Sequence, residues 1–555
     1  MRAAELMAAS LAAQGCDRIF CVPGESYLAL LDALRDDARI DVVACRHEGG
    51  AGMMALADAK ITNRPGVVAV SRGPGATNAS IALHLAEQDA APLVALIGQV
   101  ARCERGRGAF QEVDYGQMFG GIAKGVWEVH DAARLSETVA RAFHVAQSGT
   151  PGPVVIALPE DMLLDAVADG AAGGAVVSPL PVPSVAPAQT EIDRVAALLE
   201  KAERPLLIAG GMLTAAGARA ALAEAAKAHH LPVATSFKRQ EVFDNGSELF
   251  AGYLGFKIPP AQIELMERAD LVLAVGCRLG DTPTQGFRFP RAPKPVQPLV
   301  HVYPDPGVIG RVFATDIGLP CEPAAFLQAL GARPAPVPEA RRGWAAELRA
   351  LSAKMARYEP RETTDGIDFG AVVLELARQA PRDAIIATDS GNFSSWVHRI
   401  WPWDGTQTAI GAVGGAMGLG VPAAIAACLR EPSRRVIGFV GDGGALMTGS
   451  ELATARAVGA KPLIVISNNG SYGTIRLHQE RDHPRRVAAT DLVNPDFAAW
   501  AASFGALGLT ISRADEAGET VARALAHDGP AVIEVRSSLE AISAYTSIAR
   551  LRGEE

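Results

Sequence analysis

The chain has 555 residues, of which 49% are hydrophobic and 20% charged, and its formal net charge is −9. A chain of this length and apolar content has room for about three well-packed domains. The acidic balance, without a long basic run, excludes nucleic acid and anionic membrane surfaces as expected partners.

The first predicted domain, residues 1–165, alternates helical and strand-like patterns. In chain order these patterns predict a helix over Ala3–Gln14, a strand over Arg18–Cys21, a helix over Leu28–Asp36, and buried strands over Val42–Cys45, Gly66–Ser71, Leu93–Gly98 and Val154–Leu158. Such alternation is typical of a parallel sheet with helices on both faces. Residues 162–190 are rich in Ala, Gly, Pro and Val, which predicts a linker of polyproline character.

Two further predicted domains, residues 190–335 and 365–545, repeat the alternation. The expected strands are Pro205–Ala209, Pro232–Ser236, Leu271–Val275 and Leu299–Val302 in the first of them, and Ala384–Ala387, Val436–Val440, Leu463–Ser467 and Ala531–Val535 in the second. The predicted fold class is therefore α/β, with three doubly wound parallel-sheet domains. The first and third domains are candidates for a shared topology.

The cysteines and the first residues of the chain indicate the cell compartment in which the protein is expected. The seven cysteines are scattered and form no CxxC pair, so neither a disulfide framework nor a zinc site is expected. Residues Met1–Gly15 are typical of an amphipathic helix rather than of a signal peptide. Gly, Pro and charged residues interrupt every apolar stretch before it could span a bilayer. We therefore expect no membrane partner and a cytoplasmic location.

The segment Val436–Gly470 carries the most specific pattern in the chain. A strand-like run ends in the letters GDGG, and a second run ends in NN; residues 444–467 lie between GDG and NN. This length fits one helix, and a strand–helix–strand crossover makes the two strands parallel. Because the carboxyl ends of parallel strands form ligand sites, we expect Asp442 and Asn469 to meet at one edge of the sheet.

The chemistry expected at that edge is the binding of a cation and a phosphate. Carboxylate and amide oxygens suit Mg²⁺ or Ca²⁺, and Mg²⁺ commonly takes its remaining ligands from phosphates and water. Gly443 and Gly444 let the backbone come close to a phosphate at the start of the following helix. The alternative for a GDG sequence alone is an ordinary strand-to-helix turn.

The spacing of GDGG and NN resembles the thiamine diphosphate motif of the decarboxylase and carboligase superfamily. In that resemblance Asp442, Asn469 and the main-chain carbonyl of Ser471 hold Mg²⁺, which in turn holds the cofactor's diphosphate. The resemblance covers almost the full chain. It implies a pyrimidine-binding domain, a middle domain and a diphosphate-binding domain, in that order, and a homo-oligomer, dimer or tetramer, whose active sites lie between two subunits.

Glu48 is the expected catalytic acid. It follows the predicted strand Val42–Cys45 and opens a helix rich in Gly and Ala. An acidic residue is also favoured in the first turn of any helix, which is the alternative interpretation. The letters RHEGGA around it resemble the family's RHEQGA, whose glutamate hydrogen-bonds the cofactor's pyrimidine ring, so the resemblance implies that role for Glu48.

Further stretches resemble the acetolactate synthase group. SRGPGATN at residues 71–78 is similar to TSGPGATN, and AFQE at residues 109–112 is identical to that group's stretch. The resemblance implies that Phe110 and Gln111 line the substrate pocket, although an isolated Phe is more often part of a core. GAMGLGVPAA is similar to GAMGFGLPAA, whose Met supports the bent cofactor. The cofactor contacts so implied come from Pro74, Gly391, Asn392, Gly415, Met417, Gly441, Asp442, Gly443, Gly444, Asn469 and Tyr472.

Two departures from the acetolactate synthase pattern concern the substrate and a second cofactor. His478 stands where that group has a Trp that shapes the choice of acceptor, so we expect His478 to contact substrate. The group's flavin-linked Arg-Phe-Asp-Asp-Arg is replaced by residues 278–282, RLGDT. Gly210-Gly211 could lie near a dinucleotide, so FAD stays an open alternative rather than an expectation.

These features predict a thiamine diphosphate- and Mg²⁺-dependent decarboxylase or carboligase, acetolactate synthase-like, acting on a small 2-keto acid or acyl substrate. Within enzymes, the alternative is a C–C lyase of the 2-hydroxyacyl-CoA lyase or oxalyl-CoA decarboxylase type. The alternative of another class is a catalytically silent cofactor-binding protein. A P-loop nucleotide enzyme is excluded because the chain has no GxxxxGK[ST] motif.

Overall fold

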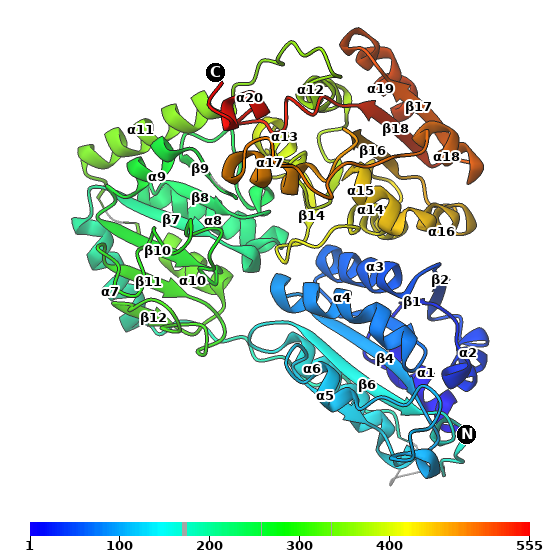
Figure 1. The fold of residues 1–555 in the computed structure, drawn as a ribbon. Helices are drawn as coiled ribbons and strands as arrows, with labels where there is room; N and C mark the ends of the chain where they lie inside the picture. The colour runs from blue at the N-terminus through cyan, green and yellow to red at the C-terminus, as the bar shows by residue number, and fades with distance from the viewer. Residues whose placement is uncertain (169–174, 257, 335, 555) are drawn as a thin grey trace. The chain divides into compact units, whose positions relative to one another are not determined.

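The computed structural model describes residues 1–168, 175–256, 258–334 and 336–554. The chain forms three six-stranded parallel sheets, each with its own helices (Figure 1). It divides into two compact units: residues 1–182, 361–395 and 410–555 form one, and residues 183–360 and 396–409 form the other. Of the expected linker, residues 169–174 lie outside the described residues. Within the described ranges, no helix has both the length and the apolar character needed to cross a membrane.

The N-terminal sheet has the order β2-β1-β3-β4-β6-β5. Its strands are β1 (Arg18–Cys21), β2 (Asp41–Ala44), β3 (Gly66–Val70), β4 (Leu93–Gln99), β5 (Val126–Glu128) and β6 (Pro153–Pro159), and its helices are α1 (Ala3–Ala13), α2 (Leu28–Arg35), α3 (Glu48–Thr62), α4 (Pro74–Asp89), α5 (Tyr115–Phe119) and α6 (Leu135–Gln147). Side chains of a strand alternate between its two faces. Accordingly, Val68 and Val70 of β3 pack in one core with α3 and α4, while Val67 and Ala69 pack in another with α1 and α6.

The middle sheet has the order β12-β11-β10-β7-β8-β9, which is the doubly wound order of dinucleotide-binding folds. Its strands are β7 (Pro205–Ala209), β8 (Val233–Ser236), β9 (Phe250–Leu254), β10 (Leu271–Val275), β11 (Leu299–Val302) and β12 (Ile317–Leu319), and its helices are α7 (Gln189–Lys201), α8 (Ala216–His229), α9 (Pro260–Met266), α10 (Pro323–Gly331) and α11 (Glu339–Ala356).

The C-terminal sheet has the order β14-β13-β15-β16-β18-β17, the same relative order as the N-terminal sheet, so the predicted shared topology is confirmed. Its strands are β13 (Ile385–Thr388), β14 (Thr408–Gly411), β15 (Val436–Gly441), β16 (Leu463–Asn468), β17 (Leu507–Ile511) and β18 (Ala531–Arg536). The helices are α12 (Phe369–Gln379), α13 (Ser394–Ile400), α14 (Gly420–Arg430), α15 (Asp442–Thr448), α16 (Leu452–Ala457), α17 (Gly473–Asp482), α18 (Phe497–Ser503), α19 (Ala517–Ala526) and α20 (Ile548–Leu551).

Five strands were not predicted from the sequence: β5, β9, β12, β14 and β17. Each of them is an outermost strand of its sheet. Edge strands are short and covered less completely, so they lack the continuous apolar run by which a central parallel strand is recognised. The burial of β5, whose three residues are all half-buried, illustrates this.

The N- and C-terminal domains share one apolar core, because α3 packs against α14. An ion network lies beside that contact. Arg430, at the end of α14, donates to both carboxylate oxygens of Asp58 at 2.8 Å and to those of Asp17 at 2.9 Å. Asp58 is buried, so its charge depends on these donors. This network joins the two domains that carry the expected cofactor residues.

A buried carboxylate on α17 binds the C-terminal segment of the chain. Glu480 is fully buried on α17 and accepts hydrogen bonds from Arg552 at 2.6 and 2.8 Å and from Arg476 at 3.0 Å. The pKa of Glu480 is lowered to about 2, and the hydrogen bonds from Arg552 are the largest cause. Because α17 directly follows the NN turn, the chain end helps to hold the helix beside the predicted cofactor site.

We expect Arg552→Ala to destabilise the attachment of the chain end by about 2 kcal/mol, since it removes two charge-assisted hydrogen bonds. The folded-state pKa of Glu480 lies below its ordinary value of 4.5, so its stabilisation is complete above 4.5 and is lost as the pH falls toward about 2. Hydrogen exchange of the α20 amides measures this. The exchange should be faster in Arg552→Ala than in wild type at neutral pH, and the difference should shrink in acid. Arg550→Ala, which changes an exposed side chain on α20, is the control. Equal exchange in wild type and Arg552→Ala would contradict this role.

Candidate cofactor site

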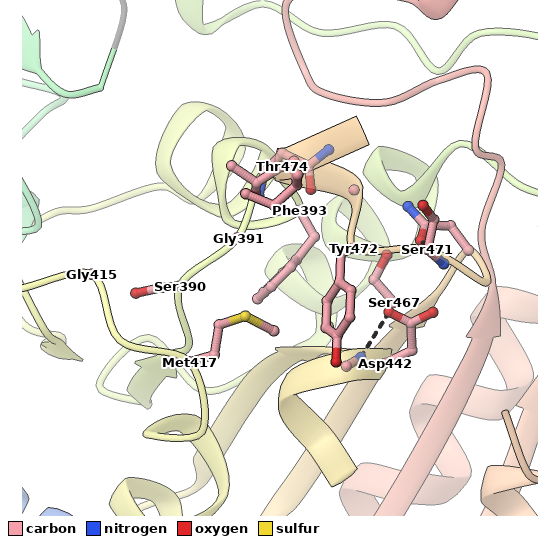
Figure 2. Close-up of a pocket in the computed structure, with 16 residues that line it drawn as sticks. Ser390, Gly391, Phe393, Gly415, Met417, Asp442, Ser467, Ser471, Tyr472 and Thr474 are labelled. Atoms are coloured by element: carbon pink, nitrogen blue, oxygen red, sulfur yellow. Dashed lines mark hydrogen bonds between the residues drawn. The ribbon is translucent and has the colours of Figure 1, made fainter. Parts of the chain in front are cut away.

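A cavity of about 200 Å³ opens at the carboxyl ends of β13, β15 and β16 and at the start of α17 (Figure 2). The predicted residues that line it are Gly391, Asn392, Gly415, Met417, Gly441, Asp442, Gly443, Asn469, Ser471 and Tyr472. Six residues that the sequence did not single out also line it: Ser390, Phe393, Ser467, Gly473, Thr474 and Ile475. All of these residues come from the C-terminal domain.

The pairing of β15 with β16 brings the GDGG and NN motifs together. The two strands are parallel, and Gly441 pairs with Ser467, so the residues that follow them leave the sheet at the same level. Gly470 then donates its N–H to Asp442 Oδ2 at 2.9 Å. The expected meeting of Asp442 and Asn469 at one sheet edge is therefore what the strand register produces.

Asp442 is a buried carboxylate with 3% of its surface exposed. Burial raises its pKa, and hydrogen bonds from the N–H groups of Gly443 and Gly470 and from the Asn494 side chain oppose that rise. Gly443 donates to Oδ1 at 2.9 Å, so one of the helix-start N–H groups expected for a phosphate is used by Asp442 itself. A cation at this carboxylate would compensate for the buried negative charge.

The two asparagines of the NN motif have different surroundings. Asn469 lines the cavity, and its Oδ1 accepts the N–H of Ser471 at 3.1 Å in a local turn. Asn468 does not line the cavity, and its Nδ2 donates to Glu534 Oε1 at 2.7 Å. The second asparagine is thus the one available to a cation, and the first is tied into the sheet.

The side chains around position 443 leave no room for any residue larger than glycine. A Cβ built at Gly443 would lie 2.5 Å from Tyr472 Cε1 and 3.3 Å from Met417 Cε. Figure 2 shows the Tyr472 ring between Asp442 on one side and Met417 and Phe393 on the other. The apolar wall made by Met417 and Phe393 thus faces the polar edge that carries Asp442, which suits a ligand with a ring at one end and a charged group at the other.

Gly444 does not line the cavity and has a packing role. A Cβ at Gly444 would lie 2.1 Å from Oδ2 of Asp389. Asp389 is fully buried and accepts the N–H groups of Gly418 at 2.9 Å and Leu419 at 3.2 Å, the two residues after Met417. Asp389 therefore fixes the turn that presents Met417. Asp389 was not predicted from the sequence, because nothing local to TDSGN indicates a partner in a turn so distant along the chain.

The predicted residues of the N-terminal domain form a second cluster. Glu48 opens α3 as expected, and Asn78 Nδ2 donates to its Oε2 at 3.0 Å. Pro74 is the first residue of α4. A Cβ at Gly73 would lie 2.9 Å from Cβ of Gln111, so the SRGPGATN and AFQE stretches are neighbours. None of these residues lines the cavity described above.

Glu451 ties the backbone beside Glu48 to the C-terminal domain. It is fully buried and accepts the N–H groups of Arg46 at 3.1 Å and His47 at 3.0 Å. Burial raises the pKa of this carboxyl group. A Cβ at Gly50 would lie 2.4 Å from its Oε1, which explains the second glycine of RHEGGA. No local sequence signal marked Glu451, because its partners come from the other domain.

Two further predicted substrate residues, Phe110 and His478, also lie outside the cavity lining. Phe110 is 75% exposed, so it is not part of a core within this chain. His478 is half-buried on α17, one turn beyond Ile475, which does line the cavity.

The oxygen atoms that Asp442 and its neighbours offer as ligands suit a cation that is bound to a diphosphate. Within the described ranges, no three His, Cys, Asp or Glu side chains are grouped to hold a metal ion. A cation here would have one carboxylate, one amide and one main-chain carbonyl from the protein, with the other positions left for phosphate and water. That set is typical of Mg²⁺ rather than of Zn²⁺.

The glycine pair suggested for flavin is closely packed against the chain. Gly210-Gly211 follows β7, beside the switch point between β7 and β10, where doubly wound sheets bind dinucleotides. A Cβ at Gly211 would lie 2.8 Å from Nε of Arg239, and one at Gly210 would lie 2.1 Å from the carbonyl oxygen of Gly276. Arg239 is only 4% exposed. The chain itself occupies the space beside both glycines.

All three domains match one protein family. Residues 1–118 match "Thiamine pyrophosphate enzyme, N-terminal TPP binding domain", residues 192–330 match "Thiamine pyrophosphate enzyme, central domain", and residues 389–535 match "Thiamine pyrophosphate enzyme, C-terminal TPP binding domain". The cavity residues lie in the third of these ranges, and Glu48 lies in the first.

Curated relatives are similar to the chain over nearly its whole length. It is 34% identical to the acetolactate synthase large subunit of Parasynechococcus marenigrum, over 96% of this chain and 87% of the relative. It is 30% identical to the acetolactate synthase isozyme 2 large subunit of Escherichia coli, over 96% of this chain and 95% of the relative. It is also 30% identical to the mitochondrial acetolactate synthase catalytic subunit of Saccharomyces cerevisiae, over 94% of this chain and 78% of the relative.

Proposed function

The chain belongs to the thiamine pyrophosphate enzyme family, and from this premise we propose a thiamine diphosphate- and Mg²⁺-dependent decarboxylase or carboligase that acts on 2-keto acids. Thiamine pyrophosphate and thiamine diphosphate are the same compound. The protein is an enzyme of the acetolactate synthase-like group. The observation that carries the proposal is the cavity that buried Asp442 lines together with Asn469, Met417 and Tyr472.

Each residue of the site has a proposed task. Thiamine diphosphate, when bound, supplies a carbon that adds to the carbonyl carbon of a 2-keto acid. Asp442, Asn469 and the Ser471 carbonyl hold Mg²⁺ against the diphosphate. Met417 would support the rings of the cofactor. Glu48 hydrogen-bonds the pyrimidine ring and controls its proton, a contribution of general acid–base catalysis.

The substrate is proposed to be a small 2-keto acid, contacted by Phe110, Gln111 and His478. The acyl-CoA lyase alternative and the silent-protein alternative are not favoured, because the relatives described above are all named acetolactate synthases. FAD stays outside the proposed reaction, because residues 278–282 replace the flavin-linked stretch of the acetolactate synthase group. The seven free cysteines favour a reducing compartment such as the cytoplasm.

We propose that a second copy of the chain completes each site, in a homodimer or homotetramer. The cavity is lined by the C-terminal domain alone, so Glu48 of the same chain does not reach it within the described lining. Large apolar side chains are exposed on the two helices next to the cavity: Leu446 and Met447 on α15 are 47% and 48% exposed, and Ile475 on α17 is 53% exposed. Contact with a second copy would bury them.

The proposed reaction is tested with purified protein, Mg²⁺, thiamine diphosphate and a panel of 2-keto acids and acyl-CoAs, with products identified by mass. We expect turnover of at least one 2-keto acid. Glu48→Gln should reduce that turnover by about 100-fold or more while leaving cofactor binding largely intact, because an amide cannot supply the proton. Glu137→Gln, at an exposed helix position, is the matched control. Turnover of acyl-CoAs alone, or full turnover by Glu48→Gln, would contradict the proposal.

The proposed shared site is tested by co-expressing Glu48→Gln and Asp442→Ala subunits. Each variant alone should be inactive. In a mixed dimer, one site combines both intact residues and the other combines both altered ones. Random pairing therefore predicts recovery of about a quarter of wild-type activity. If each site were built within one chain, mixing the two variants would restore no activity.

A further inference from the structure

A pair of asparagine amides links two carboxylates at the edge of the cavity. Asn494 Nδ2 donates to Asp442 Oδ2 and to Asn468 Oδ1, both at 2.9 Å. Asn468 Nδ2 in turn donates to Glu534 Oε1 at 2.7 Å. Glu534 is 3% exposed and lies on β18, so the amide bridge, Asn494 and Asn468, joins two buried acidic groups.

The neighbours of each amide fix its orientation. The two atoms within reach of Asn494 Nδ2 are both oxygens, and the one on Asp442 belongs to a carboxylate, which accepts hydrogen bonds when ionised. The opposite orientation would place the Asn494 oxygen against both of them. Asn468 is oriented in the same way, because its Nδ2 faces Glu534. Its Oδ1 is then left to accept from Asn494 and from the N–H of Gly470, the latter at 3.3 Å.

The bridge decides which oxygen of Asp442 is available to a cation. Oδ2 accepts two hydrogen bonds, from Asn494 and from the N–H of Gly470, both at 2.9 Å. Oδ1 accepts one, from the N–H of Gly443 at 2.9 Å. Each carboxylate oxygen has about two lone-pair directions. Oδ2 is therefore fully used, while Oδ1 keeps one direction for a further partner.

We propose that Asn494 is a positioning residue for the cation: it occupies Oδ2 of Asp442 and so presents Oδ1 to Mg²⁺. The inference rests on the proposed function, because it requires Asp442 to be a metal ligand. Residues that hold a metal ligand in place typically change metal affinity by about 10- to 100-fold when they are removed. Asn494 makes no contact with the cavity lining other than Asp442 in the described hydrogen bonds, so its effect passes through that carboxylate.

The test is a titration of Mg²⁺ at a fixed concentration of thiamine diphosphate, with cofactor binding followed by calorimetry. We expect Asn494→Ala to need about 10- to 100-fold more Mg²⁺ for half-saturation than wild type. Asn494→Ser, which keeps one donor, should lie between the two. Val493→Ala, an adjacent and fully exposed change, should titrate as wild type. The thermal midpoint of the cofactor-free protein checks that each variant folds.

A double-mutant cycle separates the bridge from a general loosening of the loop. If Asn494 and Asn468 act as one unit, Asn468→Ala and Asn494→Ala weaken Mg²⁺ binding, and the double variant is no weaker than the worse single variant. Multiplicative effects, or a wild-type titration for Asn494→Ala, overturn the inference while leaving the metal site intact. Cofactor binding by wild type that is independent of Mg²⁺ is a different result, which removes the proposed metal site and the inference together.

Discussion

The parallel pairing of β15 with β16 is the constraint on which the candidate site depends. Because Gly441 is opposite Ser467, Asp442 and the two asparagines leave the sheet side by side. A carboxylate buried at that edge is costly unless donors or a cation compensate for it. The N–H groups of Gly443 and Gly470 and the Asn494 amide supply the donors, and the cavity beside Asp442 leaves room for the cation.

The matching order of the N- and C-terminal sheets explains how the two halves of the site are related. Both sheets have the same relative order. In chain order, Glu48 follows β2, the second strand of the N-terminal sheet. Met417 follows β14, the second strand of the C-terminal sheet. Pro74 and Asp442 both follow the third strand. In both sheets the predicted site residues thus follow corresponding strands, at the carboxyl ends where sheets of this kind bind ligands.

The sequence predicted the central strands well, because residues buried on both faces give continuous apolar runs. It missed five of the six outermost strands, β2 being the one that was predicted, because short or partly buried strands give no such run. Asp442 and Asn469 were predicted because their chemistry and spacing are local, and Met417 was predicted from the resemblance of GAMGLGVPAA to a family stretch. Asp389, Glu451 and Asn494 were not, since each acts on a backbone or side chain distant in sequence. Only the packing of the domain reveals their partners.

The central claim is that the buried Asp442 carboxylate holds the diphosphate through Mg²⁺. Calorimetric titration of thiamine diphosphate into wild type and Asp442→Ala, with and without Mg²⁺, tests it most directly. We predict that wild type binds the cofactor only when Mg²⁺ is present and that Asp442→Ala shows no Mg²⁺-dependent binding. Equal, Mg²⁺-dependent affinity of both proteins would contradict the claim.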